Sequence, residues 1–136
     1  MTADDSRFLE QFEAMSLAPE EFNHSGHLRL AWLYLDSFPL EEAIQKTSRG
    51  IAAYASHLGA NDKFHCTLTE AIMRVIAARM AGEDNVETFL SRHPELVSNM
   101  NTLLAEHYSD ERLNSDLART RYITPDRAPF TRQRAA

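Results

Sequence analysis

The sequence predicts an all-α protein, a compact single-domain bundle of five to six helices followed by an irregular C-terminal strap. Apolar residues recur at steps of three and four over residues 4–107, which is the spacing of one face of a helix. No segment alternates apolar and polar residues between hairpin turns, so we expect no strands. A length of 136 residues with 43% hydrophobic residues fits one globular domain.

The first two helices are expected before residue 38. The first has a candidate cap at Asp4 or Asp5 and ends before Pro19, because the residue that precedes a proline disfavours helix. The second runs from about Asn23, a good cap, to about Ser37. Its almost unbroken apolar character predicts the buried centre of the bundle.

Four further helices are expected, over residues 39–58, 62–80, 86–92 and 95–107. Gly59 is suited to end the third. After residue 108 the pattern changes, and Ser109 and Ser115 can each cap a short helical turn. Pro125 and Pro129 predict an extended strap within residues 108–136.

The charge distribution argues against nucleic acid and anionic membranes as partners. The chain has 20 acidic and 14 basic residues, a net charge of −6. Residues 117–136 reverse this balance, with five arginines against Asp126 alone, so that segment is +4 and the rest −10. The five are Arg119, Arg121, Arg127, Arg132 and Arg134.

The number of cysteines and the hydropathy of the chain predict the cellular compartment of the protein. Cys66 is the one cysteine in the sequence, so no intrachain disulfide can form, as in a reducing compartment. The acidic N-terminus lacks the apolar stretch of a secretory signal. No apolar run approaches the roughly 20 residues that cross a bilayer. We therefore expect a cytoplasmic protein.

Two histidines at the start of the second predicted helix are the first candidates for chemistry. His24 and His27 lie three positions apart, so both imidazoles share one helical face. A helix N-terminus disfavours positive charge, which favours neutral rings, the form needed by a metal ligand or a general base. The same face continues to Tyr34, a candidate substrate contact.

His65 is the third candidate, and it shares a face of the fourth predicted helix with Thr69, a further candidate substrate contact. If the two helices meet, His24, His27 and His65 form a catalytic centre. With Glu70 added, three imidazoles and one oxygen suit a divalent metal such as zinc or iron.

Ordinary structural roles explain the same residues. Histidines spaced like His24 and His27 also occur as caps or core residues. Glu70 stands four residues before Arg74, at ion-pair spacing, and residues 67–70 match a capping box. If the histidines take part in chemistry, we expect His65→Ala to abolish activity with little loss of helix. A loss of folding as large as the loss of activity would indicate a core histidine.

Two arginines of the C-terminal segment are candidates for binding an anion. Arg119 and Arg121 can hold the carboxylate or phosphate of a substrate if the strap covers a pocket mouth. The alternative is a strap held electrostatically against the acidic body of the protein.

Several motifs together resemble a family of small bacterial all-helical proteins, over about residues 8–129. They are Phe22-x-His24-x-x-His27-Leu28, Phe64-His65-x-Thr67-x-Thr69, Tyr108-Ser109, Ala118-Arg119 and Pro125-Asp126. Phe64 stands where the family pattern has tyrosine. The resemblance implies a single-domain cytoplasmic helical protein in which the histidines and the strap belong to one unit, and it implies no reaction.

These observations predict a small-molecule enzyme of lyase, isomerase or hydrolase type that acts on an anionic substrate through a histidine-centred pocket. No nucleotide-binding fingerprint is present. One alternative is a module that binds a small ligand, a metal or haem without catalysis. Another is a structural homodimer formed through an apolar helix face.

Overall fold

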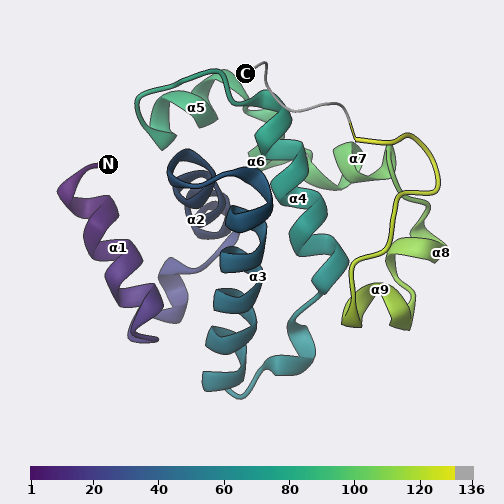
Figure 1. The fold of residues 1–136 in the computed structure, drawn as a ribbon, viewed down its shortest axis with the longest axis horizontal. Coiled ribbons are helices and arrows are strands. Elements are labelled where there is room, and N and C mark those ends of the chain that lie inside the picture. Colours follow the sequence, from purple (N-terminus) through teal and green to yellow (C-terminus); the bar gives the residue numbers. More distant parts are fainter. Residues whose placement is uncertain (131–136) are drawn as a thin grey trace. The chain divides into compact units, whose positions relative to one another are not determined.

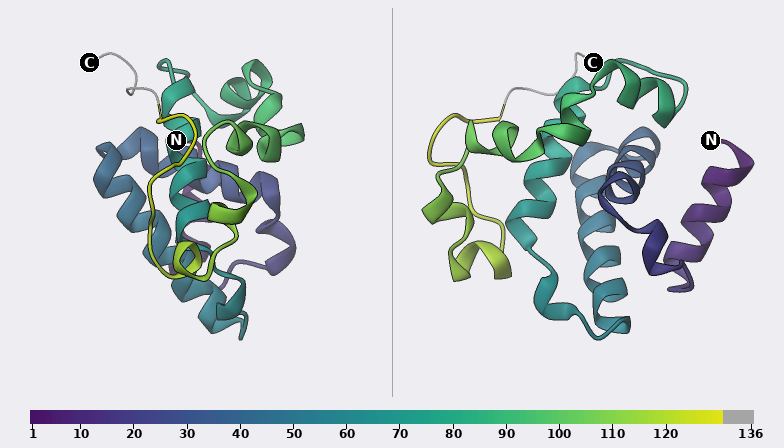
Figure 2. Two further views of the ribbon diagram at one scale, coloured as in Figure 1. Left: turned by 90° about the vertical axis from the view of Figure 1, so that its right-hand side faces the viewer. Right: turned by 180° about the vertical axis from the view of Figure 1, so that it is seen from behind.

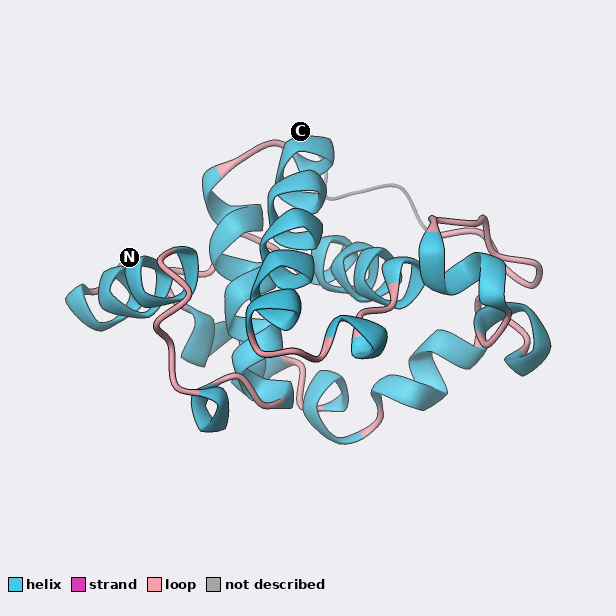
Figure 3. Ribbon diagram, turned by 90° about the horizontal axis from the view of Figure 1, so that it is seen from below, coloured by secondary structure: helices cyan, strands magenta, loops and turns pink. Residues whose placement is uncertain are grey.

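The computed structural model describes residues 1–130 and contains helices joined by loops, with no strand in that range (Figures 1 and 3). The predicted all-α class is confirmed. Residues 1–130 contain nine α-helices, more than the five to six expected, because the C-terminal part is broken into short helices. Arg132 and Arg134 lie outside the described residues.

Contacts between backbone segments divide the chain into two compact units. Unit 1 is Met1–Phe64, and unit 2 begins at His65. The single-domain organisation expected from the sequence stays a prediction. No helix within residues 1–130 is both long enough and apolar enough to cross a membrane.

Unit 1 is built from three α-helices and two short 3-10 helices. They are α1 (Ala3–Glu13), η1 (Pro19–Glu21), α2 (His24–Ser37), α3 (Leu40–His57) and η2 (Asn61–Lys63). The predicted burial of the second helix is confirmed, since every residue of α2 from Leu28 to Leu35 except Arg29 is buried. Gly59, at φ 71°, follows the end of α3 as expected.

The start of α1 differs from the prediction in its capping residue. Thr2 is the cap, and its hydroxyl accepts a hydrogen bond from the N–H of Asp5 while the Asp5 carboxylate accepts one from the N–H of Thr2. The Asp5 carboxylate also lies 2.7 Å from the Arg29 guanidinium. Asp5 therefore completes a capping box and ties α1 to α2.

Unit 2 begins with the long helix α4 (Cys66–Arg79) and continues through five shorter helices. They are α5 (Val86–Arg92), α6 (Glu95–Ser98), α7 (Met100–Ala105), α8 (Asp110–Leu113) and α9 (Asp116–Thr120). Ser109 and Ser115 cap α8 and α9, as predicted. The expected helix over residues 95–107 is interrupted at Asn99, whose φ of −136° is not helical.

The chain from Arg121 to Phe130 is irregular, which confirms the predicted strap within the described residues. It runs beside α8 and α9 (Figure 2, yellow). The Ser109 hydroxyl and N–H both donate to the Asp126 carboxylate, at 2.6 and 2.8 Å. The Tyr108 hydroxyl donates to the carbonyl of Ile123 at 2.7 Å. These side-chain hydrogen bonds fix the segment together with two backbone hydrogen bonds, from the N–H groups of Arg127 and Ala128 to the carbonyls of His107 and Glu106.

Candidate functional site

The start of α2 holds His27 in place through a cap and an aromatic stack. The Asn23 side chain accepts a hydrogen bond from the N–H of Gly26 at 2.9 Å, which fixes the first turn. Phe22, just before the cap, stacks on the His27 ring with centroids 3.9 Å apart. This is the arrangement of a hydrophobic staple. A Cβ at Gly26 would collide with the backbone carbonyl of Glu21, so the close approach of η1 to α2 requires glycine.

The hydrogen bonding of His27 determines which nitrogen carries its proton. Nδ1 lies 2.9 Å from the carbonyl oxygen of Asn23. A carbonyl oxygen can only accept, so the proton of the neutral ring is on Nδ1. Nε2 has no hydrogen-bond partner within residues 1–130. The ring therefore presents an unprotonated nitrogen with a free lone pair, as a general base requires.

Next to this ring is an apolar hollow of about 170 Å³, here called the His27 hollow. Its walls include the rings of Phe22, Tyr54 and Phe64, and the Lys63 side chain lies at its lining. The Tyr54 hydroxyl donates to the buried carbonyl of Leu17 at 2.7 Å, so Tyr54 contributes only its ring. Among the lining residues, His27 and Lys63 have side chains with a polar group that has no hydrogen-bond partner within residues 1–130.

Electrostatics favour the neutral form of His27. Partial burial lowers the pKa of the imidazole below its usual value, and the nearby charge of His24 lowers it further. The hydrogen bond to Asn23 opposes both effects by favouring the protonated ring. The net direction is downward, so His27 is neutral at pH 7.

His24 has a different environment from His27. It is exposed at the first turn of α2 and does not contribute to the walls of the His27 hollow. Its charge acts on His27 electrostatically. The predicted pair of imidazoles therefore provides one histidine at the hollow and one outside it.

His65 uses both of its ring nitrogens for backbone hydrogen bonds. It is the N-cap of α4, with Nδ1 accepting from the N–H of Leu68 at 3.1 Å. Nε2 donates to the carbonyl of Leu113 at 2.8 Å. Burial lowers the pKa of His65, and the charge of Arg119 lowers it further. This neutral ring caps one helix and links it to α8, as the structural alternative predicts.

The observed start of α4 explains why His65 has a different role from the one predicted from the sequence. The predicted fourth helix began near Asp62, but η2 and an extended Phe64 precede α4, which begins at Cys66. The Thr69 hydroxyl consequently donates to the carbonyl of His65 at 2.8 Å instead of facing a substrate. The capping box that residues 67–70 offered as an alternative explanation is not formed, because the cap of α4 is His65.

The proposed metal ligands are not assembled into a metal centre. Among residues 1–130, no group of three or more His, Cys, Asp or Glu side chains is placed to hold a metal ion. The Glu70 carboxylate pairs with the Arg74 guanidinium at 2.8 Å, the i, i+4 ion pair that the sequence offered as an alternative. Glu70 and His65 are thus committed to other partners.

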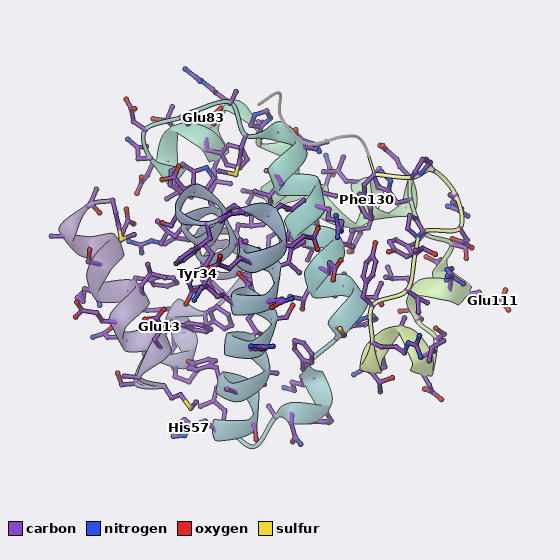
Figure 4. All side chains as sticks on the ribbon, viewed as in Figure 1. Glu13, Tyr34, His57, Glu83, Glu111 and Phe130 are labelled. Carbon is purple, nitrogen blue, oxygen red and sulfur yellow. The ribbon has the colours of Figure 1, made fainter. Side chains whose placement is uncertain are left out.

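The remaining predicted substrate contacts belong to different units of the chain. Tyr34 is 6% exposed and its hydroxyl donates to the Glu13 carboxylate at 2.6 Å (Figure 4). Arg119 and Arg121 are both exposed in unit 2. The Arg121 carbonyl accepts a hydrogen bond from the Thr67 hydroxyl at 2.8 Å. No described hollow is lined by either arginine.

Sequence reasoning did not single out Lys63 and Tyr54, which line the His27 hollow, or the contact of Thr67 with the strap. Lys63 and Tyr54 lie far along the chain from His27 and carry no motif. A weak signal existed for Lys63, because lysine occurs at only two positions in a chain otherwise rich in arginine. Thr67 was read as part of a capping box, whereas its hydroxyl joins α4 to the strap.

No known protein family matches the chain, and neither a curated protein nor a solved structure is significantly similar to it. The resemblance to a family of small bacterial helical proteins therefore stays a prediction.

Proposed function

We propose that unit 1 binds a small carboxylate with an apolar body in the His27 hollow, and that His27 removes a proton from it in a lyase or isomerase step. The observation that carries the proposal is the hydrogen bond from Nδ1 of His27 to Asn23, which leaves Nε2 unprotonated beside an apolar space. General-base catalysis needs a neutral imidazole that is free on one nitrogen.

The size and lining of the hollow support a ligand with an apolar body. An apolar protein cavity of about 150 Å³ holds a benzene molecule. The His27 hollow, at about 170 Å³, therefore suits one ring or a short branched chain. Aromatic walls from Phe22, Tyr54 and Phe64 favour such a group through stacking and burial.

The ammonium group of Lys63 supports the proposal that the ligand is an anion. This group has no carboxylate within ion-pair distance among residues 1–130. An ammonium at the lining of an apolar hollow attracts a carboxylate and orients the carbon next to it. Proton removal from that carbon requires a base beside it, and Nε2 of His27 is the available base.

Binding is tested through the lysines of the full-length protein. Reductive methylation with ¹³C-formaldehyde labels Lys46, Lys63 and the α-amine while leaving their charge. Titration with benzoate should shift the Lys63 signal in a saturable way and leave the Lys46 signal unchanged. Benzyl alcohol, which has the ring without the charge, should bind about tenfold more weakly, because it lacks the charged hydrogen bond. Lys63→Arg assigns the signal.

Catalysis is tested by deuterium exchange. Phenylacetate and isobutyrate are incubated with the protein in D₂O, and loss of the proton next to the carboxylate is followed by proton NMR. His27→Phe keeps the stack on Phe22 but removes Nε2, so exchange should fall to the uncatalysed rate. His24→Gln, one turn away and exposed, should exchange like the wild type. Exchange that survives His27→Phe would contradict the assignment of the base.

One observation favours a second candidate function, a binding module without catalysis. The Tyr54 hydroxyl is already bonded to Leu17, so the lining offers no hydroxyl to return a proton. Saturable binding of benzoate without deuterium exchange supports this second function. Absence of saturable binding overturns both.

A further inference from the structure

We infer that a second hollow in unit 1 binds a small zwitterion of the amino-acid type, with its ammonium group on Glu13 and its carboxylate on Lys46 and Arg49. This space, here called the Tyr34 cleft, measures about 390 Å³. Ligand pockets usually measure about 300–1,000 Å³. The inference is independent of the function proposed for the His27 hollow.

The negative side of the cleft comes from the end of α1. The Glu13 carboxylate lines the cleft, and its Oε2 accepts the hydrogen bond of the Tyr34 hydroxyl at 2.6 Å. Oε1 accepts no hydrogen bond within residues 1–130. The C-terminal end of a helix also carries partial negative charge. An ammonium group is therefore favoured on this side, and Tyr34 holds the carboxylate in place for it.

The positive side of the cleft comes from α3. Lys46 and Arg49 are three positions apart on that helix, and both line the cleft. Among residues 1–130, neither has a carboxylate within ion-pair distance. The Lys46 ammonium is instead held 4.7 Å from the centre of the Phe38 ring. Two cations without a carboxylate partner, in a chain of net charge −6, leave a place for an anionic group.

Phe12 and Gly50 pack tightly against each other where they line the cleft. Gly50 lies on α3 between the charged turn and Ala53, and both small residues line the cleft. A Cβ at Gly50 would lie 2.7 Å from the Phe12 ring, which is 2% exposed and packed against Phe22 and Tyr54. The absence of a side chain at Gly50 thus lets Phe12 form the floor. An apolar side chain on the ligand fits against this ring.

The two lysines of the sequence separate this inference from the function proposed above. Lys46 lines the Tyr34 cleft and Lys63 lines the His27 hollow. A ligand of one space is therefore expected to move one lysine signal and leave the other in place. Failure of either proposal can be recognised without reference to the other.

The experiment titrates the ¹³C-methylated full-length protein with L-leucine. The Lys46 signal should shift in a saturable way while the Lys63 signal stays in place. N-acetyl-L-leucine lacks the ammonium group and L-leucinamide lacks the carboxylate, so each should bind about tenfold more weakly than leucine. Equal binding of leucine and N-acetyl-leucine would indicate a simple anion site and overturn the inference, as would the absence of a saturable shift.

Matched variants assign each half of the ligand to its side of the cleft. Glu13→Gln keeps an acceptor for the Tyr34 hydroxyl but removes the charge, so it should weaken leucine about tenfold and leave N-acetyl-leucine unchanged. Arg49→Gln should weaken both leucine and N-acetyl-leucine. Glu10→Gln, an exposed carboxylate one turn earlier on α1, is the control and should bind leucine normally. An equal loss in Glu10→Gln and Glu13→Gln would contradict the assignment. Circular dichroism confirms that each variant is folded.

Discussion

His27 in unit 1 and His65 in unit 2 both stand at the start of a long helix, and the chain uses them differently. His65 engages both ring nitrogens with backbone groups, at 2.8 and 3.1 Å. His27 engages only Nδ1 and places its ring in the lining of a hollow. A histidine with both nitrogens bonded holds structure together, whereas one with a free nitrogen can exchange protons with a ligand.

The same contrast extends to the surroundings of the two histidines. In unit 2 the hydroxyls of Thr67, Tyr108 and Ser109 are all bonded to the strap. In unit 1 Lys46 and Lys63 line hollows without carboxylate partners among the described residues. Unit 2 therefore uses these polar groups to fix an irregular chain, whereas in unit 1 the two lysines have no carboxylate partner among residues 1–130.

The largest expected effect is on stability, and it comes from His65→Ala. This change removes the cap of α4 and leaves the carbonyl of Leu113 without its donor, so we expect a loss of about 3 kcal/mol in the free energy of unfolding. His27→Ala, which removes one stacking contact and one exposed hydrogen bond, should cost about 1 kcal/mol. Urea unfolding followed by circular dichroism measures both.

His65→Asn separates the two contributions of His65. Asparagine is a good N-cap but is too short to replace the bond to Leu113, so it should recover about 1 kcal/mol of the loss. A result in which His65→Ala and His27→Ala destabilise the chain equally would remove the distinction between a structural and a free histidine.

The second effect concerns the strap. Thr67 is 0% exposed, and its hydroxyl donates to the carbonyl of Arg121 and accepts from the N–H of Ile123, at 2.8 and 3.1 Å. Thr67→Val keeps the shape but leaves both backbone groups without a partner, so we expect a loss of about 2 kcal/mol. Thr67→Ser keeps the hydroxyl and should lose less than half as much. Amide exchange of Ile123 should accelerate in Thr67→Val and stay slow in Thr67→Ser.

Local patterns allowed much of the fold to be predicted. The buried centre at α2, the ends of α5, the caps at Ser109 and Ser115 and the glycine after α3 all follow from short-range spacing and capping chemistry. These features depend on residues within a few positions of each other, so the sequence contains the information directly.

The start of α4 shows why the site was harder to predict than the fold. Periodicity alone extends α4 back to Asp62, but the chain is extended at Phe64 because His65 takes the cap position. Its second nitrogen then bonds to Leu113, 48 positions away. No local pattern contains that contact. The sequence therefore does not distinguish a histidine with hydrogen bonds at both ring nitrogens from one with a hydrogen bond at a single nitrogen.

The third effect is a dependence of stability on pH. Burial lowers the pKa of both His27 and His65 in the folded chain. Above the ordinary histidine pKa of about 6.5, both rings are neutral in either state, and pH has no effect through them. Below it, the unfolded chain takes up protons that the folded chain does not, so the free energy of unfolding falls. Each ring can contribute at most about 1.4 kcal/mol per pH unit.

Urea unfolding at pH 7, 6 and 5 measures this dependence. Matched variants show how much of it comes from each of the two histidines. His27→Phe and His65→Asn should each flatten part of the fall between pH 7 and pH 5, since each removes one group whose pKa is lower in the folded chain than in the unfolded chain. Variants that keep the full wild-type slope would show that the two rings are protonated in the folded protein.

The smallest effect tests the backbone at the edge of the Tyr34 cleft. Within residues 1–130, Met15 is the one residue other than glycine with a positive φ, at 60°. It follows the end of α1, where the N–H of Ser16 bonds to the carbonyl of Gln11 at 2.8 Å and that of Met15 to the carbonyl of Phe12 at 3.0 Å. Glycine is the usual residue at this position of such a helix end.

Met15→Gly should stabilise the chain by about 0.5 kcal/mol, because relief of the left-handed strain slightly exceeds the greater entropy of glycine in the unfolded chain. Ala14→Gly, at a position with ordinary helical geometry, should instead destabilise it by about 0.5–1 kcal/mol. Differential scanning calorimetry measures both changes in stability, which should have opposite signs. A loss of stability in Met15→Gly would show that the methionine side chain stabilises the end of α1 by more than its backbone strain costs.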